Sequence, residues 1–212
     1  MNLIQIAEPA IEPVSLVEAK GHLKIDADMT EDDWLITMLI KTARRFAEKY
    51  TSRSLINQSW QIVMDAFPGY RCASGFQLAG SAIVVEGSSI IIRNGPVTSI
   101  TSISYIDTDG NWQTMASTDY IFDPSGLVQR VGPAYGKTWP VPRNQIACVK
   151  INYQAGFGAT PDKVPDTFRQ WMLLRLNTLY ENREEVAILG RGKVDPLPFI
   201  DGLLDFEKVP VI

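Results

Sequence analysis

The sequence of 212 residues has few of the residues on which many enzymes and metal proteins depend. Histidine occurs once, as His22, and cysteine twice, as Cys72 and Cys148. These counts exclude a four-ligand Cys/His zinc set and an HExxH motif, and they leave few ways to build a Ser-His-acid triad. We expect the two distant cysteines to be free thiols. The sequence therefore predicts no cofactor, no metal site and no enzyme.

A strong charge of either sign and a long apolar run are also missing. Lys and Arg number 20 and Asp and Glu 24, a formal net charge of -4, which is too balanced for a protein whose whole surface binds nucleic acid. No apolar run approaches the ~18 residues that span a bilayer. The N-terminus lacks the basic-then-apolar form of a secretion signal. We expect a cytoplasmic product with no membrane partner.

Two helices are predicted near the N-terminus. Ser15 and Glu18 have the spacing of a capping box, which predicts a short helix within 13–23, with His22 in its last turn. A longer helix is expected from Thr30, its N-cap, to Thr51. Its expected apolar stripe is Leu35, Met38, Leu39, Ala43, Phe46 and Tyr50, with Thr37, Lys41, Arg44 and Glu48 on the opposite side.

Basic residues are concentrated on this second helix and just after it. They are Lys41, Arg44, Arg45, Lys49 and Arg53. Such a cluster is compatible with a strip that faces phosphates, with a solvated face, or with a salt-bridge surface between subunits. Glu48 interrupts the cluster and favours the last two interpretations over the first.

The middle of the chain, 58–155, changes to a period of two residues, which is typical of strands. Turn-forming pairs such as Asn94-Gly95 and Asp109-Gly110 separate short segments, so we expect antiparallel pairing. The segment 70–82 has no clear period and is expected to be a long loop. The predicted strands are 60–67, 83–85, 89–93, 97–106, 112–115, 120–122, 127–131 and 146–153.

A third helix is predicted from Pro165 to Asn182. Leu173 and Leu174 widen its apolar face well beyond one stripe, so the helix needs two burial partners. The first helical pair is one, and the second is either the sheet of the same chain or a neighbouring subunit. The tail, 188–212, mixes apolar residues with Gly and Pro, which predicts an arm that packs on its own domain or on a partner.

Acidic residues near the predicted turns are the remaining candidates for chemistry. The segment 107–110, Asp-Thr-Asp-Gly, resembles the start of a calcium loop, but Ala116 stands where the bidentate Glu is required. A hairpin turn is the favoured interpretation. Asp107, Asp119 and Asp123 could in principle supply paired carboxylates for a small hydrolase, which we keep as a remote alternative.

A series of short motifs follows in a fixed order along about 13–205. The motifs are 13–20 (PVSLVEAK), Asp32-Asp33, 43–51 (ARRFAEKYT), Gly95-Pro96-Val97, Ile103-Ser104-Tyr105, Trp139-Pro140, 153–158 (YQAGFG), Val164-Pro165 and 179–184 (LYENRE). Each motif is weak alone, whereas the ordered set is fairly specific. In this order the motifs resemble the head–tail connector proteins of tailed bacteriophages.

This resemblance implies an α+β fold, in which a small helical bundle of two N-terminal helices and a C-terminal helix carries an inserted antiparallel β region and an extended C-terminal arm. It implies one connector domain over 1–212, with helical parts 13–53 and 162–184, the β region 58–155 and the arm 188–212. The function implied is a structural adaptor that forms a twelve-fold ring beneath the portal of the virion and is assembled in the host cytoplasm. The partners would be further copies, the portal protein, a tail-completion, stopper or tail protein, and viral DNA that passes through the lumen.

Two sets of residues are candidates for these contacts. For the subunit interface they are Trp171, Leu173, Leu174, Lys41, Arg44 and Arg45, and for the portal-docking arm Val194, Leu197, Phe199, Ile200, Leu203, Leu204 and Phe206. A tail-completion or baseplate-type structural protein is the main alternative function.

Overall fold

The computed structural model describes residues 2–69, 84–85, 89–181 and 198–209. The chain divides into two compact units. We call the described residues within 2–9 and 57–156 the β unit, and those within 10–56 and 157–209 the helical unit. The mixed α+β class with antiparallel sheets, expected from the sequence, is confirmed.

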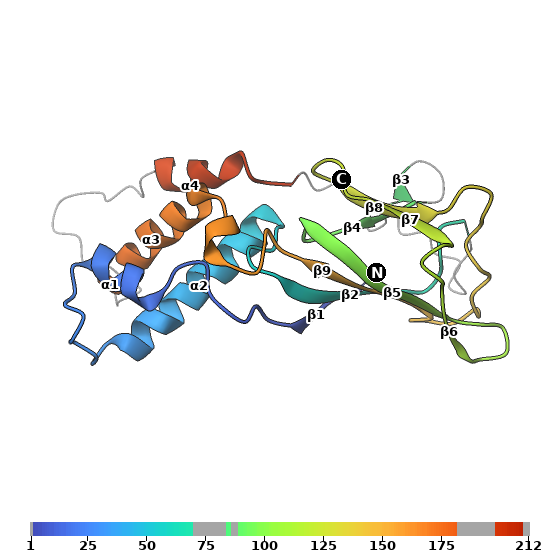
Figure 1. Ribbon diagram of the computed structural model, residues 1–212, viewed down its shortest axis with the longest axis horizontal. Coiled ribbons are helices and arrows are strands. Elements are labelled where there is room, and N and C mark those ends of the chain that lie inside the picture. The colour runs from blue at the N-terminus through green and yellow to red at the C-terminus, as the bar shows by residue number, and fades with distance from the viewer. Residues whose placement is uncertain (1, 70–83, 86–88, 182–197, 210–212) are drawn as a thin grey trace, which may run out of the picture. The chain divides into compact units, whose positions relative to one another are not determined.

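The β unit contains two antiparallel sheets (Figure 1). The five-stranded sheet has the order β1-β2-β9-β5-β6 and the four-stranded sheet the order β3-β4-β8-β7. The strands are β1 (Asn2–Ala7), β2 (Gln58–Met64), β3 (Val84–Val85), β4 (Ser89–Ile92), β5 (Val97–Ile106), β6 (Trp112–Thr114), β7 (Tyr120–Asp123), β8 (Gln129–Pro133) and β9 (Val149–Ala155).

The eight predicted strands are present with small shifts at their ends, whereas β1 was not predicted. This strand pairs with β2 in a register that places Leu3 opposite Ile62. The stretch of alternating apolar and polar residues in β1 is short, and no turn-forming residues precede it. The sequence pattern alone therefore does not identify this strand. The loop expected over 70–82 lies outside the described residues.

Apolar side chains from both sheets form one core in the β unit. Ile62, Ile103 and Ile151 of the five-stranded sheet are fully buried there, together with Val131 of the other sheet. The buried side chain of Gln129 links the two sheets, because its Oε1 accepts a hydrogen bond from the Val97 N–H and its Nε2 donates to the Val97 carbonyl at 3.3 Å. This pairing satisfies polar groups that burial would otherwise penalise.

The helical unit contains α1 (Leu16–Leu23), α2 (Asp33–Thr51), the 3₁₀ turn η1 (Pro161–Lys163), α3 (Asp166–Glu181) and α4 (Pro198–Asp205). Within it, α3 contacts α1, α2 and α4, and α2 also contacts α1 and α4 (Figure 1). The shared core includes Ile36, Ile40, Phe168, Trp171 and Leu204. The C-terminal segment therefore belongs to the same core as the two N-terminal helices.

The start of α1 is as predicted, and the N-cap of α2 is two residues later than expected. The Ser15 Oγ accepts from the Glu18 N–H at 3.2 Å, while a Glu18 carboxylate oxygen accepts from the Ser15 N–H at 2.8 Å, so the capping box is complete. Thr30 does not cap α2. Its carbonyl accepts from the Asp33 N–H at 3.2 Å in a turn, and Asp32 occupies the N-cap without a side-chain cap.

The buried face of α2 differs from the expected stripe by roughly a quarter turn of the helix. Met38 and Phe46, expected inside, are 49% and 46% exposed. Arg44, expected on the opposite side, is buried. The buried residues of the helix are Ile36, Leu39, Ile40, Ala43, Arg44, Ala47 and Thr51. The prediction failed because it treated Arg44 as a solvent-facing charge, whereas paired charges can be buried.

Candidate assembly surfaces of the helical unit

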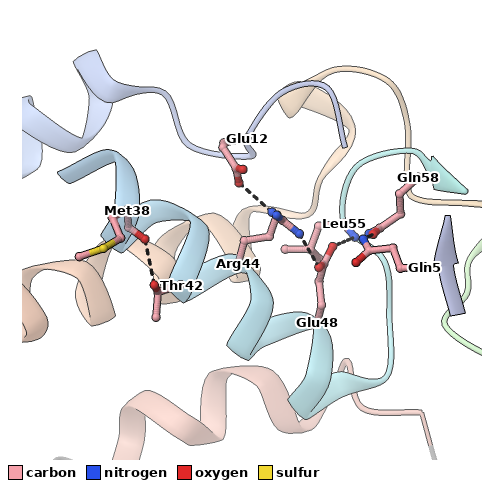
Figure 2. A network of polar contacts seen from close by, with 8 residues as sticks. All are labelled: Gln5, Glu12, Met38, Thr42, Arg44, Glu48, Leu55 and Gln58. Atoms are coloured by element: carbon pink, nitrogen blue, oxygen red, sulfur yellow. Dashed lines mark hydrogen bonds and ion pairs between the residues drawn. The ribbon is translucent and has the colours of Figure 1, made fainter. Parts of the chain in front are cut away.

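The basic cluster of the second helix is divided between the interior and the surface. The Arg44 side chain is buried, and its Nε and Nη1 donate to Glu12 and Glu48, each at 2.8 Å (Figure 2). The other Glu48 carboxylate oxygen accepts from the Leu55 N–H at 3.0 Å. Burial alone would lower the pKa of Arg44, but the carboxylates of Glu48 and Glu12 together raise it. Arg44 is therefore a charged structural residue that ties three segments together.

Arg53 also has an internal role. Its guanidinium lies 3.3 Å from a Glu207 carboxylate oxygen and 5.5 Å from the ring centre of Phe157. Lys41, Arg45 and Lys49, by contrast, are exposed. The sequence placed all five basic residues in one cluster, but only these three lie on the surface of the helical unit.

The exposed residues of α2 form a stripe along its solvent side. Lys41, Arg45 and Lys49 follow one another at i, i+4 spacing, which places them on the same face. Trp34 and Met38, which are 68% and 49% exposed, continue this face toward the start of the helix. We call these five residues the α2 stripe. It combines cations with large apolar side chains, and the sequence did not identify its apolar half as exposed.

The loop between α1 and α2 is acidic and is held from inside by a buried lysine. The Lys20 Nζ lies 2.6 Å from an Asp33 carboxylate oxygen and donates to the Met29 carbonyl at 2.7 Å. A longer bond, 3.4 Å, reaches the Ala27 carbonyl. The outward side chains of this segment include the exposed acids Asp26, Asp28 and Glu31. We call 26–31 the acidic loop.

The interface candidates on α3 have two different environments. Trp171 is fully buried and stacks on Phe46, with ring centres 5.6 Å apart. Leu173 and Leu174 are half-buried. Trp171 therefore lies in the core of its own unit, as Arg44 does, whereas Leu173 and Leu174 keep apolar surface that a neighbour could cover.

The C-terminal arm is not extended where the structure describes it, because 198–205 forms α4. Leu204 is fully buried in the helical core and Leu203 packs against it. Polar contacts fix the end of the segment: the Tyr50 hydroxyl donates to Asp205 at 2.8 Å, and the Val209 N–H donates to the Thr51 carbonyl at 3.0 Å. This part of the arm packs on its own unit.

The other arm candidates are only partly described. Phe206 follows α4 and is 93% exposed. Phe199 and Ile200 lie in α4, but their side chains are outside those described, and Val194 and Leu197 lie outside the described residues altogether. Phe206 is thus the most exposed of the arm candidates whose side chains are described, whereas Leu203 is half-buried and Leu204 is buried.

The three carboxylates of the hydrolase alternative are engaged within their own turns and hairpins. Asp107 accepts from the Gln113 side chain at 2.8 Å and from the Asn111 and Asp109 N–H groups, and these bonds lower its pKa. Asp123 is bonded to Ser125, which likewise lowers its pKa. Asp119 lies 3.5 Å from Lys137. A glycosidase acid needs a raised pKa, so this arrangement does not favour that chemistry.

The calcium-loop resemblance at 107–110 is explained by the same contacts, since Asp107 closes the turn between β5 and β6. Over the described ranges, no group of three or more His, Cys, Asp or Glu side chains is arranged to hold a metal ion. A search of the same ranges finds no helix that is both long and apolar enough to span a bilayer.

Comparison with known proteins matches residues 13–73 to a family described as phage gp6-like head-tail connector protein. This range contains α1, the acidic loop, α2 and β2. The resemblance inferred from the ordered motifs is thereby confirmed. No curated protein gives a significant sequence match to the chain.

Solved structures share the fold over the whole chain. A chain from the neck of an empty gene transfer agent (GTA) particle, computed with C6 symmetry, is similar with a TM-score of 0.77 and 19% identity, and the match covers 100% of this chain and 98% of that one. A chain from the virion of a native GTA particle gives 0.76 and 21%, with the same coverage. A chain from the neck of the native particle, computed with C12 symmetry, gives 0.70 and 20%, again with 100% and 98% covered.

Proposed function

We propose that this chain is a structural head–tail connector, an adaptor located at the head–tail junction of a phage-like particle. The observation that carries the proposal is the match of 13–73 to the connector family. The shared fold with chains from particle necks, over the full length of both, supports the same role. A structural protein also fits the site, where the buried charged side chains of Arg44 and Lys20 hold neighbouring segments together.

The chain acts as one copy of a ring. The similar necks were computed with C6 and C12 symmetry, which supports a ring, and twelve copies would match a twelve-fold portal. A closed ring needs a heterologous interface, in which each chain offers two different patches. Leu173 and Leu174 on α3 and the exposed cations Lys41 and Arg45 on α2 are the candidates that remain on the surface.

The ring binds the portal on one side and a tail-completion, stopper or tail protein on the other. The segment around Val194, Leu197 and Phe206 is proposed to dock on the portal, and the high exposure of Phe206 supports its part in this. Viral DNA passes through the lumen of the ring, and the protein does not recognise its base sequence. A formal net charge of -4 is compatible with a channel that must not hold DNA tightly.

The native mass of the purified protein, alone and with its cognate portal, tests this function. We expect a ring of about twelve copies, either free or seated on the portal. A protein that stays monomeric and never associates with the portal would contradict the proposal.

A tail-completion or baseplate-type protein would have the same fold at a different place in the particle. A reconstruction of the particle separates the two functions, since a connector adjoins the portal and a baseplate protein lies at the far end of the tail. No described feature of the chain favours the second position.

A further inference from the structure

The five-stranded sheet of the β unit has two edges that lack the usual protection against pairing. Among the described residues, β1 and β6 are its outermost strands, and each forms a ladder with one neighbour, β2 and β5 respectively. Natural proteins usually protect such edges with charged side chains or proline. The sequences of β1 (NLIQIA) and β6 (WQT) contain neither. The bulge of β1 lies near its end, between Gln5 and Ala7, so the rest of the strand is regular.

Large apolar side chains are exposed at both edges, on the same face of the sheet. Ile4 is 44% exposed and Trp112 is 47% exposed. Ile4 lies opposite Gln61, whose amide donates to Asn152 at 2.8 Å. Lys150 precedes Asn152 by two residues on β9 and so shares its face, and the Lys150 Nζ lies 4.3 Å from a ring centre of Trp112. The two exposed side chains are therefore on one face, at opposite edges.

The two edges cannot meet within one chain, but they can meet between copies. Four strand spacings separate β1 from β6, roughly 19 Å in all. All four ladders between them are antiparallel, so β1 and β6 run in the same direction. A second copy placed beside the first in the same orientation brings its β6 against β1 as a parallel pair. Each copy then uses one edge of each kind, which is the heterologous contact that a closed ring requires.

The other described edges fit β1 less well. Pairing of β1 with the β1 of another copy is two-fold and ends after two chains, so it cannot build a ring. In the four-stranded sheet, β7 ends in Asp123, which is paired with Arg130 at 3.2 Å, and charges at an edge oppose pairing. The remaining edge strand, β3, has two residues. The uncharged strand β6 is thus the most suitable partner.

We propose that β1 of one copy pairs with β6 of the next copy, so that the five-stranded sheets join around the ring. The proposal rests on the function proposed above and adds a contact in the β unit to the candidates on α2 and α3. Ile4 and Trp112 then lie on the same face at the junction, where pairs of aromatic and β-branched residues are favourable. Because β6 has three residues, this pairing is one part of the ring interface.

Disulfide cross-linking of the full-length chain tests the pairing. One variant carries Ile4→Cys and Trp112→Cys and a second carries Ile4→Cys and Thr114→Cys, both with Cys72→Ser and with the buried Cys148 retained. A disulfide requires Cα atoms within about 7 Å, so a bond from position 4 to β6 joins two chains. The assembled protein, alone and with the portal, is oxidised mildly and separated on a denaturing gel. At least one variant should give a ladder that extends to about twelve chains.

The matched control combines Ile4→Cys with Gln113→Cys. Gln113 is also an exposed residue of β6, but alternation along the strand places it on the opposite face. This control should give at least about tenfold less cross-linked product. Ile4→Cys alone, in the same background, should give no ladder. A ladder of equal strength in the Gln113→Cys control, or a strong dimer from Ile4→Cys alone, overturns the inference.

A substitution without cysteine provides a second readout. Ile4→Lys places a charge on the proposed junction and should raise the protein concentration needed for assembly at least about tenfold, measured by native mass and light scattering. Ile121→Lys, the same change at an isoleucine of β7 that is 57% exposed, should leave assembly unchanged. Thermal unfolding of both variants separates lost assembly from lost folding. If Ile4→Lys unfolds, the cross-linking result decides.

Failure of this inference and failure of the proposed function are distinguishable. A wild-type ring that gives no ladder in either test variant and tolerates Ile4→Lys overturns the inference and leaves the function intact. A wild-type protein that forms no ring, even with the portal, contradicts the proposed function itself.

Discussion

At the scale of single residues, Arg44 has a role that its sequence neighbours do not share. It is buried in the helical unit, where it binds Glu12 and Glu48, while Lys41 and Arg45 on the same helix are exposed. The charged side chains of Arg44, Glu12 and Glu48 are thus brought together and largely shielded from solvent. Removing one partner of such a network leaves an uncompensated buried charge, which is more costly than the net worth of the network itself.

Replacement of Arg44 by Met should lower the free energy of unfolding by about 3–5 kcal/mol, because Glu12 and Glu48 lose their common partner. Urea denaturation followed by circular dichroism measures the change. Lys41→Met, on the exposed side of the same helix, is the control and should stay within about 0.5 kcal/mol of the wild type. Equal stability of the two variants would show that the Arg44 network is not structural.

The capping box of α1 predicts a pH dependence with a definite sign. The Ser15 backbone bond, the Ser15 hydroxyl and Arg169 lower the pKa of Glu18 from its ordinary value of 4.5. Since the folded-state pKa lies below the unfolded one, the contribution to stability is present above about pH 4.5 and is lost as the pH falls through the folded-state pKa. Ser15→Ala should cost about 1 kcal/mol at pH 7.

Denaturation curves of wild type and Glu18→Gln between pH 3 and 7 check this sign. The difference in stability between the two proteins should be largest at neutral pH and should shrink as Glu18 becomes protonated. A difference that grows toward low pH would contradict the assignment.

At the scale of elements, local signals predicted where helices and strands lie, but not which faces are buried. The capping box located α1, and the period of two located most strands of the β unit. The predicted buried face of α2 was rotated from the observed one, since Arg44 is buried and Met38 is exposed. The burial of Arg44 depends in part on Glu12, which is distant in sequence. A hydrophobic pattern carries no information about a buried charge network that involves Glu12.

The tail illustrates a second limit of sequence patterns. Gly and Pro suggested a broken, extended arm, yet Pro198 begins a helix, a position where proline is well tolerated. Burial of Leu204 and the contacts of Asp205 and Val209 hold this helix on its own unit. Its short length means that packing, rather than helix propensity, stabilises it.

We expect Leu204→Ala to destabilise the helical unit by about 2–5 kcal/mol, since it creates a cavity in the shared core. Phe206→Ala, two residues away, should leave the unfolding midpoint nearly unchanged because that side chain is 93% exposed. Calorimetric scans of the two variants make the comparison. If Phe206→Ala is instead the more destabilising change, the packing of the segment is different from that described.

At the scale of the whole molecule, burial divides the residues expected at the subunit interface into two groups, those in the core of the chain and those with exposed surface. Of the six expected from the sequence, Trp171 and Arg44 are internal, and Leu173, Leu174, Lys41 and Arg45 retain surface. Sequence alone could not make this division, because an apolar residue on a wide helix face serves either a core or a neighbour.

Leu174→Asp should weaken ring assembly more than it weakens folding if this half-buried side chain faces a neighbour. The introduced carboxylate would be desolvated only in the assembled state. Sedimentation of the variant reports assembly, and thermal unfolding of the monomer reports folding. An equal loss of both would assign Leu174 to the core of its own chain.

The position of the protein in the particle is the most direct test of the connector function. A reconstruction of the particle at side-chain resolution should contain a ring of about twelve copies of this chain between the portal and the tail. Density for the chain at the baseplate, or its absence from the head–tail junction, would contradict the account.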